Sequence, residues 1–181
     1  MNPRYRTGLH LAVVATLLAG GSAFAGALDP TDLAGNWSGG WMNTTFGSSG
    51  DASMVITIDS PTQMTMTIDL DGGVFGGPDP AAEDWIGAIG PGGVTVNQTS
   101  PLFGPLTLAI DTMGNLAGLG MPPNAGFLNV VFTGTVTESM VDINYVVNFT
   151  VGPPAVGTLT LTHDFTPVEA SGWSAIKKLY R

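Results

Sequence analysis

The chain has 181 residues and no cysteine, which excludes disulfide bonds and thiol chemistry. It carries 14 Asp and Glu against 5 Lys and Arg, and no Lys or Arg occurs between Gly26 and Ile176. Such an acidic body repels phosphate backbones, so nucleic acid is excluded as a partner.

The first 25 residues have the features of a secretory signal peptide. Arg4 and Arg6 precede an apolar run from Leu9 to Gly20, and Ala23-Phe24-Ala25 supplies the small-x-small cleavage pattern. The apolar run is too short to span a membrane. We therefore predict a helical signal peptide over residues 1–25 and a secreted or periplasmic mature protein.

The segment Leu33–Gly50 contains Trp37 and Trp41, with Gly39 between them. A spacing of four residues fits one face of a helix and also one face of a strand. The surrounding Gly, Asn, Ser and Thr oppose a helix, so the segment predicts a strand that carries both rings on one face.

Alternation with period 2 follows along the chain. Met54–Asp59 and Met64–Leu70 each place one apolar row against one polar row, and Asp59–Thr62 provides the turn between them. In Leu128–Val136 we expect Leu128 on the same inward face as Phe132. Further candidate strands are Leu106–Asp111, Leu116–Gly120, Val141–Phe149 and Thr158–His163, with shorter ones at Val74–Gly76, Trp85–Ile89 and Val94–Asn97.

These patterns predict an all-β domain over residues 26–165, built as an antiparallel up-and-down β-barrel of about 8–11 strands. Closing the sheet buries the single apolar row of each strand and removes exposed edges. A two-sheet β-sandwich is the alternative. A membrane-spanning barrel is a further class, but no clear aromatic girdle flanks the strands.

Asp32-Leu33-Ala34-Gly35-Asn36-Trp37 contains a Gly-x-Trp arrangement that resembles the first strand of the calycins, the lipocalin-like and avidin-like barrels. The resemblance implies a small secreted bacterial barrel in which Trp37 plugs one end. In lipocalins a C-terminal arginine or lysine stacks on this tryptophan, whereas the last strand here offers His163.

Four residues are candidates for ligand contact: Trp41, Trp85, Asn43 and His163. Aromatic faces bind flat or apolar groups, and a ring beside Asn43 and Thr45 also suits a sugar. His163 continues the face of Leu159 and Leu161, but a lone imidazole without a second ligand is more typical of a structural histidine.

Two acidic segments are candidate calcium ligands. Asp69 and Asp71 begin a sequence similar to a calcium-binding loop, and Glu83 and Asp84 lie in the next acidic segment. The glutamate that completes an EF-hand is missing, and Asp and Gly also occur in turns without any metal. We predict no cofactor, and the lack of a nucleophile-base pattern argues against an enzyme.

Residues 166–172 read as a linker, and residues 173–181 as a basic aromatic tail. Trp173, Lys177, Lys178 and Arg181 fall in a segment with helical spacing that is too short to be stable alone. We expect a short helix that needs a surface. That surface is either the acidic body of the protein itself, or an envelope partner such as a sorting receptor or anionic membrane.

The functional prediction is a non-enzymatic barrel that binds a small molecule or acts as an accessory module. The alternative is a structural or adhesive protein of the cell envelope that binds proteins or glycans. A tryptophan-lined cavity of several hundred Å³ would favour ligand binding. An interior filled by Met54, Met66, Leu108, Phe132 and Tyr145 would favour the structural role.

Overall fold

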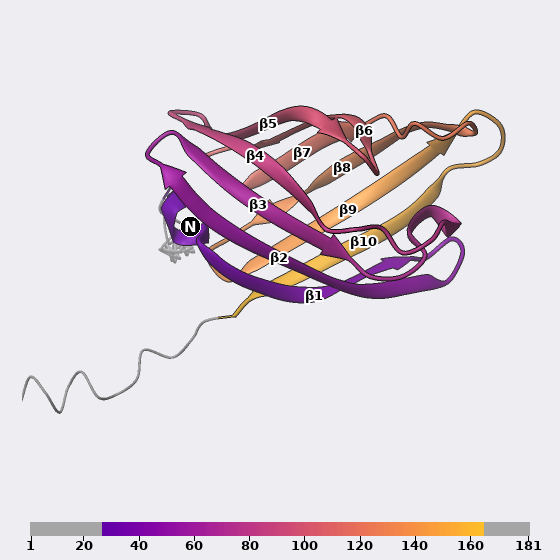
Figure 1. Ribbon diagram of the computed structural model, residues 1–181, viewed down its shortest axis with the longest axis horizontal. Helices are drawn as coiled ribbons and strands as arrows, with labels where there is room; N and C mark the ends of the chain where they lie inside the picture. Colours follow the sequence, from indigo (N-terminus) through magenta and orange to yellow (C-terminus); the bar gives the residue numbers. More distant parts are fainter. Residues whose placement is uncertain (1–26, 165–181) are drawn as a thin grey trace, which may run out of the picture.

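The computed structural model describes residues 27–164, which form ten antiparallel strands closed into one barrel (Figure 1). Two short 3-10 turns occur in this range, η1 (Pro30–Leu33) and η2 (Val74–Gly76). The predicted signal peptide, the linker 166–172 and the tail 173–181 lie outside the described residues. The strands are β1 (Gly35–Asn43), β2 (Ser48–Ser60), β3 (Gln63–Leu70), β4 (Glu83–Gly90), β5 (Gly93–Ser100), β6 (Gly104–Ile110), β7 (Asn115–Gly120), β8 (Phe127–Val136), β9 (Met140–Phe149) and β10 (Ala155–His163).

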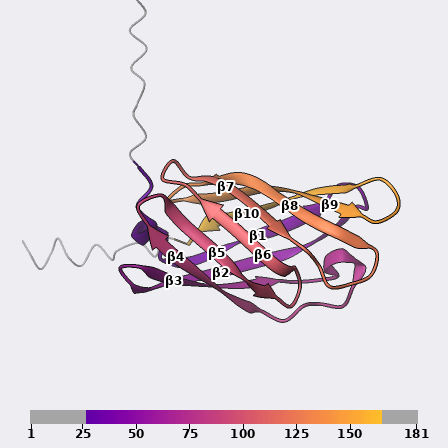
Figure 2. The ribbon, with the colours of Figure 1, turned by 90° about the horizontal axis from the view of Figure 1, so that it is seen from above.

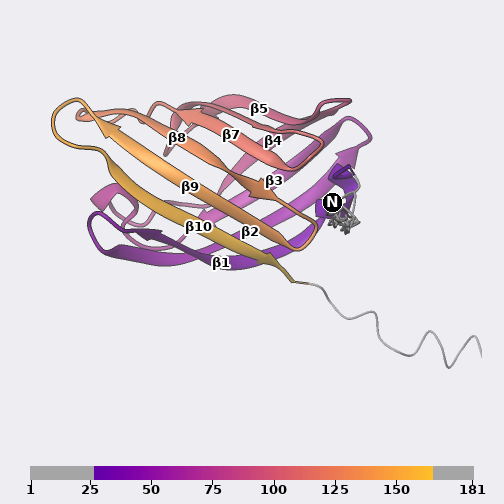
Figure 3. The same cartoon turned by 180° about the vertical axis from the view of Figure 1, so that it is seen from behind.

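Every strand pairs with the next one along the chain, and β10 returns to pair with β1. The closing register places Trp37 opposite His163 and Asn43 opposite Gly157. Figure 3 shows the run from β7 to β10 on the far side of the barrel. The up-and-down barrel predicted from the sequence is confirmed, and the two-sheet alternative is wrong.

The two ends of the barrel differ. Figure 1 shows η1 and both ends of the described chain at one end, which we call the closed end, and η2 at the other, which we call the mouth. The strands run obliquely between the two ends, as Figure 2 shows from above, and this tilt is what a closed sheet requires. The mouth is formed by the connections at residues 44–47, 71–82, 101–103, 121–126 and 150–154.

The alternation seen in the sequence sets which side chains face inward. Leu106, Leu108 and Ile110 of β6 are buried, while the residues between them are exposed. On β10, Leu161 is buried and Thr160 is exposed. Apolar side chains therefore face the interior and threonines cover the outer face, as period-2 patterning predicts.

Two details of the strand prediction are wrong. Val74–Gly76 is η2 rather than a strand, because left-handed backbone at Gly72, Phe75 and Gly76 turns the chain there. Leu128 is 58% exposed rather than inward, because the pairing of β8 with β9 shifts register between Phe127 and Asn129. An irregularity of this kind shifts the alternation of the side chains that precede it.

None of the helical turns within residues 27–164 has the length and hydropathy of a membrane span.

Candidate functional site

The barrel encloses a cavity of about 480 Å³. It extends from Leu33 near the closed end to Phe149 at the mouth, and its walls are mostly aliphatic and aromatic. Met66, Leu108 and Phe132, which could have filled the interior, line this cavity instead. A volume of several hundred Å³ with apolar walls is typical of small-molecule sites.

The closed end is built around Trp37, which is 1% exposed. Its indole Nε1 donates a hydrogen bond to the backbone oxygen of Leu33 at 3.0 Å, which fixes η1 across the end of the barrel. Leu33 lines the cavity, whereas Trp37 is not among the lining residues. The ring therefore lies behind the floor of the cavity, a position suited to the plug that the calycin resemblance implies.

His163, a predicted ligand contact, also lies at the closed end and does not line the cavity. Its ring stacks on Trp37 with centroids 4.4 Å apart and planes 5° apart. The Nδ1 atom lies 2.9 Å from the backbone oxygen of Glu138. Gly35 lies against the imidazole with a φ of +140°, where any Cβ would collide with Nε2. These contacts fit the structural role of His163 that the sequence analysis considered.

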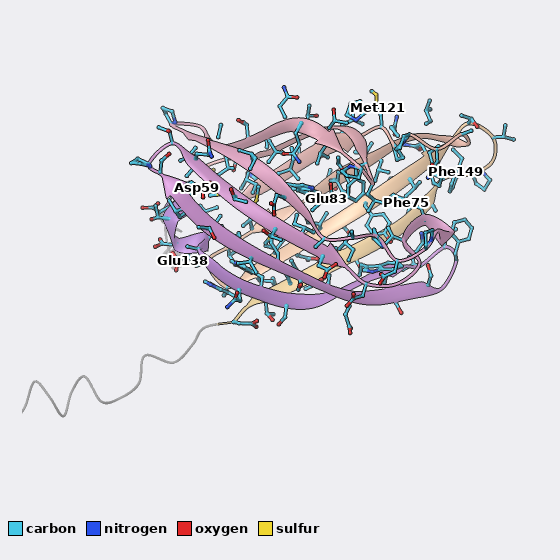
Figure 4. The ribbon with its side chains drawn as sticks, viewed as in Figure 1. Asp59, Phe75, Glu83, Met121, Glu138 and Phe149 are labelled. Carbon is cyan, nitrogen blue, oxygen red and sulfur yellow. The ribbon has the colours of Figure 1, made fainter. Side chains whose placement is uncertain are left out.

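Aromatic rings gather at the mouth. Phe46, Phe149, Phe127, Phe75 and Phe103 contact one another in that order, with ring centroids 5.3–6.3 Å apart. Phe103 continues this series inward to Trp85 and Phe132. Such distances are typical of favourable aromatic pairs. Figure 4 shows Phe75 and Phe149 at the same end of the barrel, opposite Asp59 and Glu138.

Phe75 occupies the middle of this aromatic series and is held in an unusual backbone conformation. Its φ of 55° and ψ of 24° are left-handed, and no other non-glycine residue in the described range has a positive φ. This conformation costs about 1–2 kcal/mol for a residue with a Cβ. The backbone hydrogen bonds of η2 stay within its own loop, and the ring of Phe75 contacts Phe103 and Phe127 beside the cavity.

The predicted ligand residues on β1 line the cavity, but part of their polar capacity is already used. Trp41 donates from Nε1 to the backbone oxygen of Asp71 at 2.8 Å. The Oδ1 atom of Asn43 accepts from the backbone N–H groups of Thr45 and Phe46, both at 3.0 Å. Trp41 thus ties the β3–β4 connection to β1, and Asn43 shapes the turn that follows β1.

Trp85 of β4 lines the cavity and is 7% exposed. Its indole Nε1 is buried and has no hydrogen-bond partner among the described residues. The same is true of the Oε2 atom of Glu83, whose Oε1 accepts from Ser100 Oγ at 2.9 Å. Trp85 is therefore the predicted contact whose hydrogen-bonding group is still unpaired.

The four candidate calcium ligands do not converge on one site. Among residues 27–164, no group of three or more His, Asp or Glu side chains is placed to hold a metal ion. Asp69 and Asp71 lie near the mouth, Glu83 binds Ser100, and Asp84 accepts from Thr67 Oγ1 at 2.6 Å on the outer face. The four carboxylates therefore do not form a metal-binding group, although β3 and β4 are neighbours in the sheet.

Asp71 gives a prediction with a defined sign. Partial desolvation, followed by the charges of Asp69, Asp79 and Asp51, raises the pKa of Asp71. A raised pKa means that the folded state favours the protonated carboxyl of Asp71 over the carboxylate. Ionisation of Asp71 therefore lowers the stability of the fold as the pH rises through this pKa. We expect Asp71→Asn to raise the melting temperature at pH 7 by a small amount, with the gain shrinking as the pH falls to about 3.

Asp111→Asn provides the control of opposite sign. Hydrogen bonds from the side chain and backbone of Asn115 lower the pKa of Asp111, so its ionised form stabilises the fold at neutral pH. This substitution should lower the melting temperature at pH 7 and have less effect near pH 3. Equal shifts for the two variants in melting curves across this pH range would contradict the assignment.

The sequence did not point to Phe75, Phe103, Phe127 or Phe149 as site residues. The available signal was the placement of phenylalanines in or beside the glycine-rich and proline-rich connections that become the mouth. Trp41 and Trp85 were candidates because aromatic faces bind flat or apolar groups.

Comparisons with protein-family models, with curated proteins and with solved structures find no match to this chain. The closed antiparallel barrel of ten strands is compatible with a calycin-like architecture. Function therefore has to be argued from the cavity and its lining.

Proposed function

We propose that the protein is a secreted or periplasmic, non-enzymatic β-barrel that binds an apolar small molecule in its interior. The observation that carries this proposal is the cavity of about 480 Å³ with aliphatic and aromatic walls. Binding in such a cavity releases water from apolar surfaces of both ligand and protein.

The lining favours an apolar ligand over a sugar. Trp41 and Asn43, the pair that suited a glycan, already spend Nε1 and Oδ1 on the backbone of Asp71 and of the turn after β1. A sugar would bring many hydroxyl groups into a space whose walls offer few partners, and unpaired buried hydroxyls are costly.

Other features support the proposal indirectly. The predicted signal peptide supports export, and the similarity of residues 32–37 to the first calycin strand supports a binding barrel closed at one end by a tryptophan. The apolar interior and threonine-rich outer face are the reverse of the pattern of a membrane-spanning barrel with a polar lumen.

The test blocks the cavity and leaves the outer face as a control. Leu159 of β10 lines the cavity, whereas its neighbour Thr160 is exposed on the outer face. We expect Leu159→Trp to lower the affinity of the mature protein for the neutral fluorescent probe N-phenyl-1-naphthylamine by about tenfold or more, because the added ring occupies ligand volume. Thr160→Trp, the same side chain on the same strand, should leave the affinity unchanged.

Fluorescence titration measures both affinities, and circular dichroism verifies that each variant keeps its β structure. Equal loss of affinity in both variants would place probe binding outside the cavity. No binding by the wild-type protein would remove the proposal and favour the structural or adhesive envelope protein instead.

A further inference from the structure

Two side chains on the inner wall near the mouth, Asn43 and Tyr145, keep a hydrogen-bonding group unpaired. Asn43 is 7% exposed, and its Oδ1 atom accepts from the backbone N–H groups of Thr45 and Phe46. Neither its Nδ2 group nor the hydroxyl of Tyr145 has a hydrogen-bond partner among the described residues. Unlike Trp85 Nε1, neither of these two atoms is closed off from the space around it, and both residues line the cavity.

The closing of the sheet brings the two groups toward each other. Gly157 of β10 pairs with Asn43 on one side and with Tyr145 on the other, so the three residues form one row across β1, β10 and β9 (Figure 3). Gly157 shares its face of β10 with Leu159, which lines the cavity. A Cβ at Gly157 would collide with Cζ and the hydroxyl oxygen of Tyr145 and with the backbone oxygen of Met42. The phenol therefore lies over Gly157 and carries its hydroxyl toward β1 and Asn43.

Both groups are hydrogen-bond donors. The Nδ2 group of Asn43 only donates, and the phenol of Tyr145 donates its proton. Burial raises the pKa of Tyr145, so the phenol keeps this proton at neutral pH. Adjacent strands lie roughly 4.8 Å apart, and two donors at about this separation can both lie about 2.9 Å from one oxygen. The pair therefore suits a single shared acceptor.

The charge of the barrel restricts that acceptor. No Lys or Arg occurs between Gly26 and Ile176, so the walls offer no side-chain cation to a carboxylate or a phosphate. Near the mouth, partial desolvation and the charges of three neighbouring aspartates raise the pKa of Asp71, which indicates a negative potential there. An anionic ligand would be repelled at the mouth and would lack compensation inside. The acceptor is therefore neutral.

We propose that the ligand is an apolar compound with one neutral carbonyl group, whose oxygen accepts from Asn43 Nδ2–H and from the Tyr145 hydroxyl. This inference rests on the proposed function and specifies its ligand class. A carbonyl oxygen has two lone pairs in one plane, so it can accept from both donors. An alcohol would bring a further hydrogen, and either this hydrogen or that of Tyr145 would then lack an acceptor. An alkane or alkene would leave both donors unpaired.

The experiment compares three ligands of similar shape as competitors that displace N-phenyl-1-naphthylamine from the mature protein. 2-Acetylnaphthalene carries a ketone, 2-isopropenylnaphthalene has a CH₂ group in place of the carbonyl oxygen, and 2-naphthoate carries a carboxylate. A wall without free donors would favour the alkene, because a carbonyl is costly to desolvate. We expect the reverse, with the ketone bound about tenfold more tightly than the alkene and 2-naphthoate bound most weakly.

A hydroxyl deletion tests the role of Tyr145. Tyr145→Phe keeps the ring and should lower the affinity for the ketone by about fivefold while leaving that for the alkene unchanged. Thr158→Val is the matched control, because it removes a hydroxyl next to Gly157 from the face of β10 that does not line the cavity. This control should leave both affinities unchanged.

An exchange of donor for acceptor tests the role of Asn43. In Asn43→Asp, Oδ1 still accepts from the N–H groups of Thr45 and Phe46, so the turn after β1 is kept. The other carboxylate oxygen repels a carbonyl oxygen but accepts from a hydroxyl. The wild-type protein should prefer 2-acetylnaphthalene to 1-(2-naphthyl)ethanol, the alcohol of the same skeleton, and Asn43→Asp should reverse this preference.

The outcomes separate this inference from the proposed function. Binding of the probe by each variant verifies that its cavity is intact. A wild-type protein that binds the alkene or 2-naphthoate as tightly as the ketone overturns the inference and leaves an apolar binding protein. Equal affinities of Tyr145→Phe and Thr158→Val for the ketone, or an unchanged preference in Asn43→Asp, also overturn it. Failure of the probe to bind the wild-type protein overturns both.

Discussion

Replacing Trp37 by alanine is expected to lower the free energy of unfolding by about 3–5 kcal/mol, the range for large buried aromatic residues. The substitution removes a ring that is 1% exposed, its hydrogen bond to Leu33 and its stacking on His163. The chain has no disulfide to compensate. Urea denaturation followed by circular dichroism measures the change.

Two further variants divide this effect. Trp37→Phe keeps a buried ring but lacks the N–H, so it should cost less than Trp37→Ala. His163→Ala removes the stacked ring and the contact of Nδ1 with the backbone oxygen of Glu138, and should cost about 1–2 kcal/mol. A loss below about 1 kcal/mol for Trp37→Ala would show that the closed end does not depend on this residue.

Adding a single methyl group at Gly39 is expected to destabilise the barrel by about 3 kcal/mol or more, at the upper end for overpacking. A Cβ at Gly39 would lie 2.0 Å from the backbone oxygen of Thr160 and 3.0 Å from the Cα of Leu161. Both atoms belong to the backbone of β10, so they can move away only if the pairing of β10 with β1 is disrupted. Gly39→Ala should therefore weaken barrel closure itself.

Gly90→Ala is the matched control for Gly39→Ala. Gly90 is the last residue of β4, a Cβ there would meet no atom within 4 Å, and its φ is not in the left-handed region. We expect a change within about 0.5 kcal/mol for this variant. Similar urea midpoints for the two alanine variants would contradict the close approach of β1 and β10.

The fold could be predicted from the sequence because it depends on one repeated pattern, the alternation of apolar and polar residues. In segments such as Met64–Leu70 the alternation assigns each side chain to a face, and many short strands with a single apolar row favour closure. The predictions for Leu128 and for Val74–Gly76 were wrong. A register shift and a left-handed turn are backbone features, and hydrophobic alternation carries no information about either.

Only part of the candidate site could be predicted from the sequence. The chemistry of aromatic rings made Trp41 and Trp85 candidates, but it could not say that Trp41 donates to Asp71 while the Nε1 of Trp85 is left unpaired. The contact of Trp37 with His163 joins opposite ends of the barrel sequence. The aromatic rings at the mouth come from separate connections, and only the closed sheet brings them together.

The pairing of β1 with β10 also sets the order in which the chain can finish folding. Each of the other strand pairs joins neighbours along the sequence, but this one joins segments that are 126 residues apart at Ser38 and Asp164. Contacts of such long sequence separation slow folding, since the loop must close before they form. Until β10 pairs with β1, the sheet therefore has two unpaired edges, one on each of these strands. Those edges can pair with other chains, so the barrel is most prone to aggregate just before it closes.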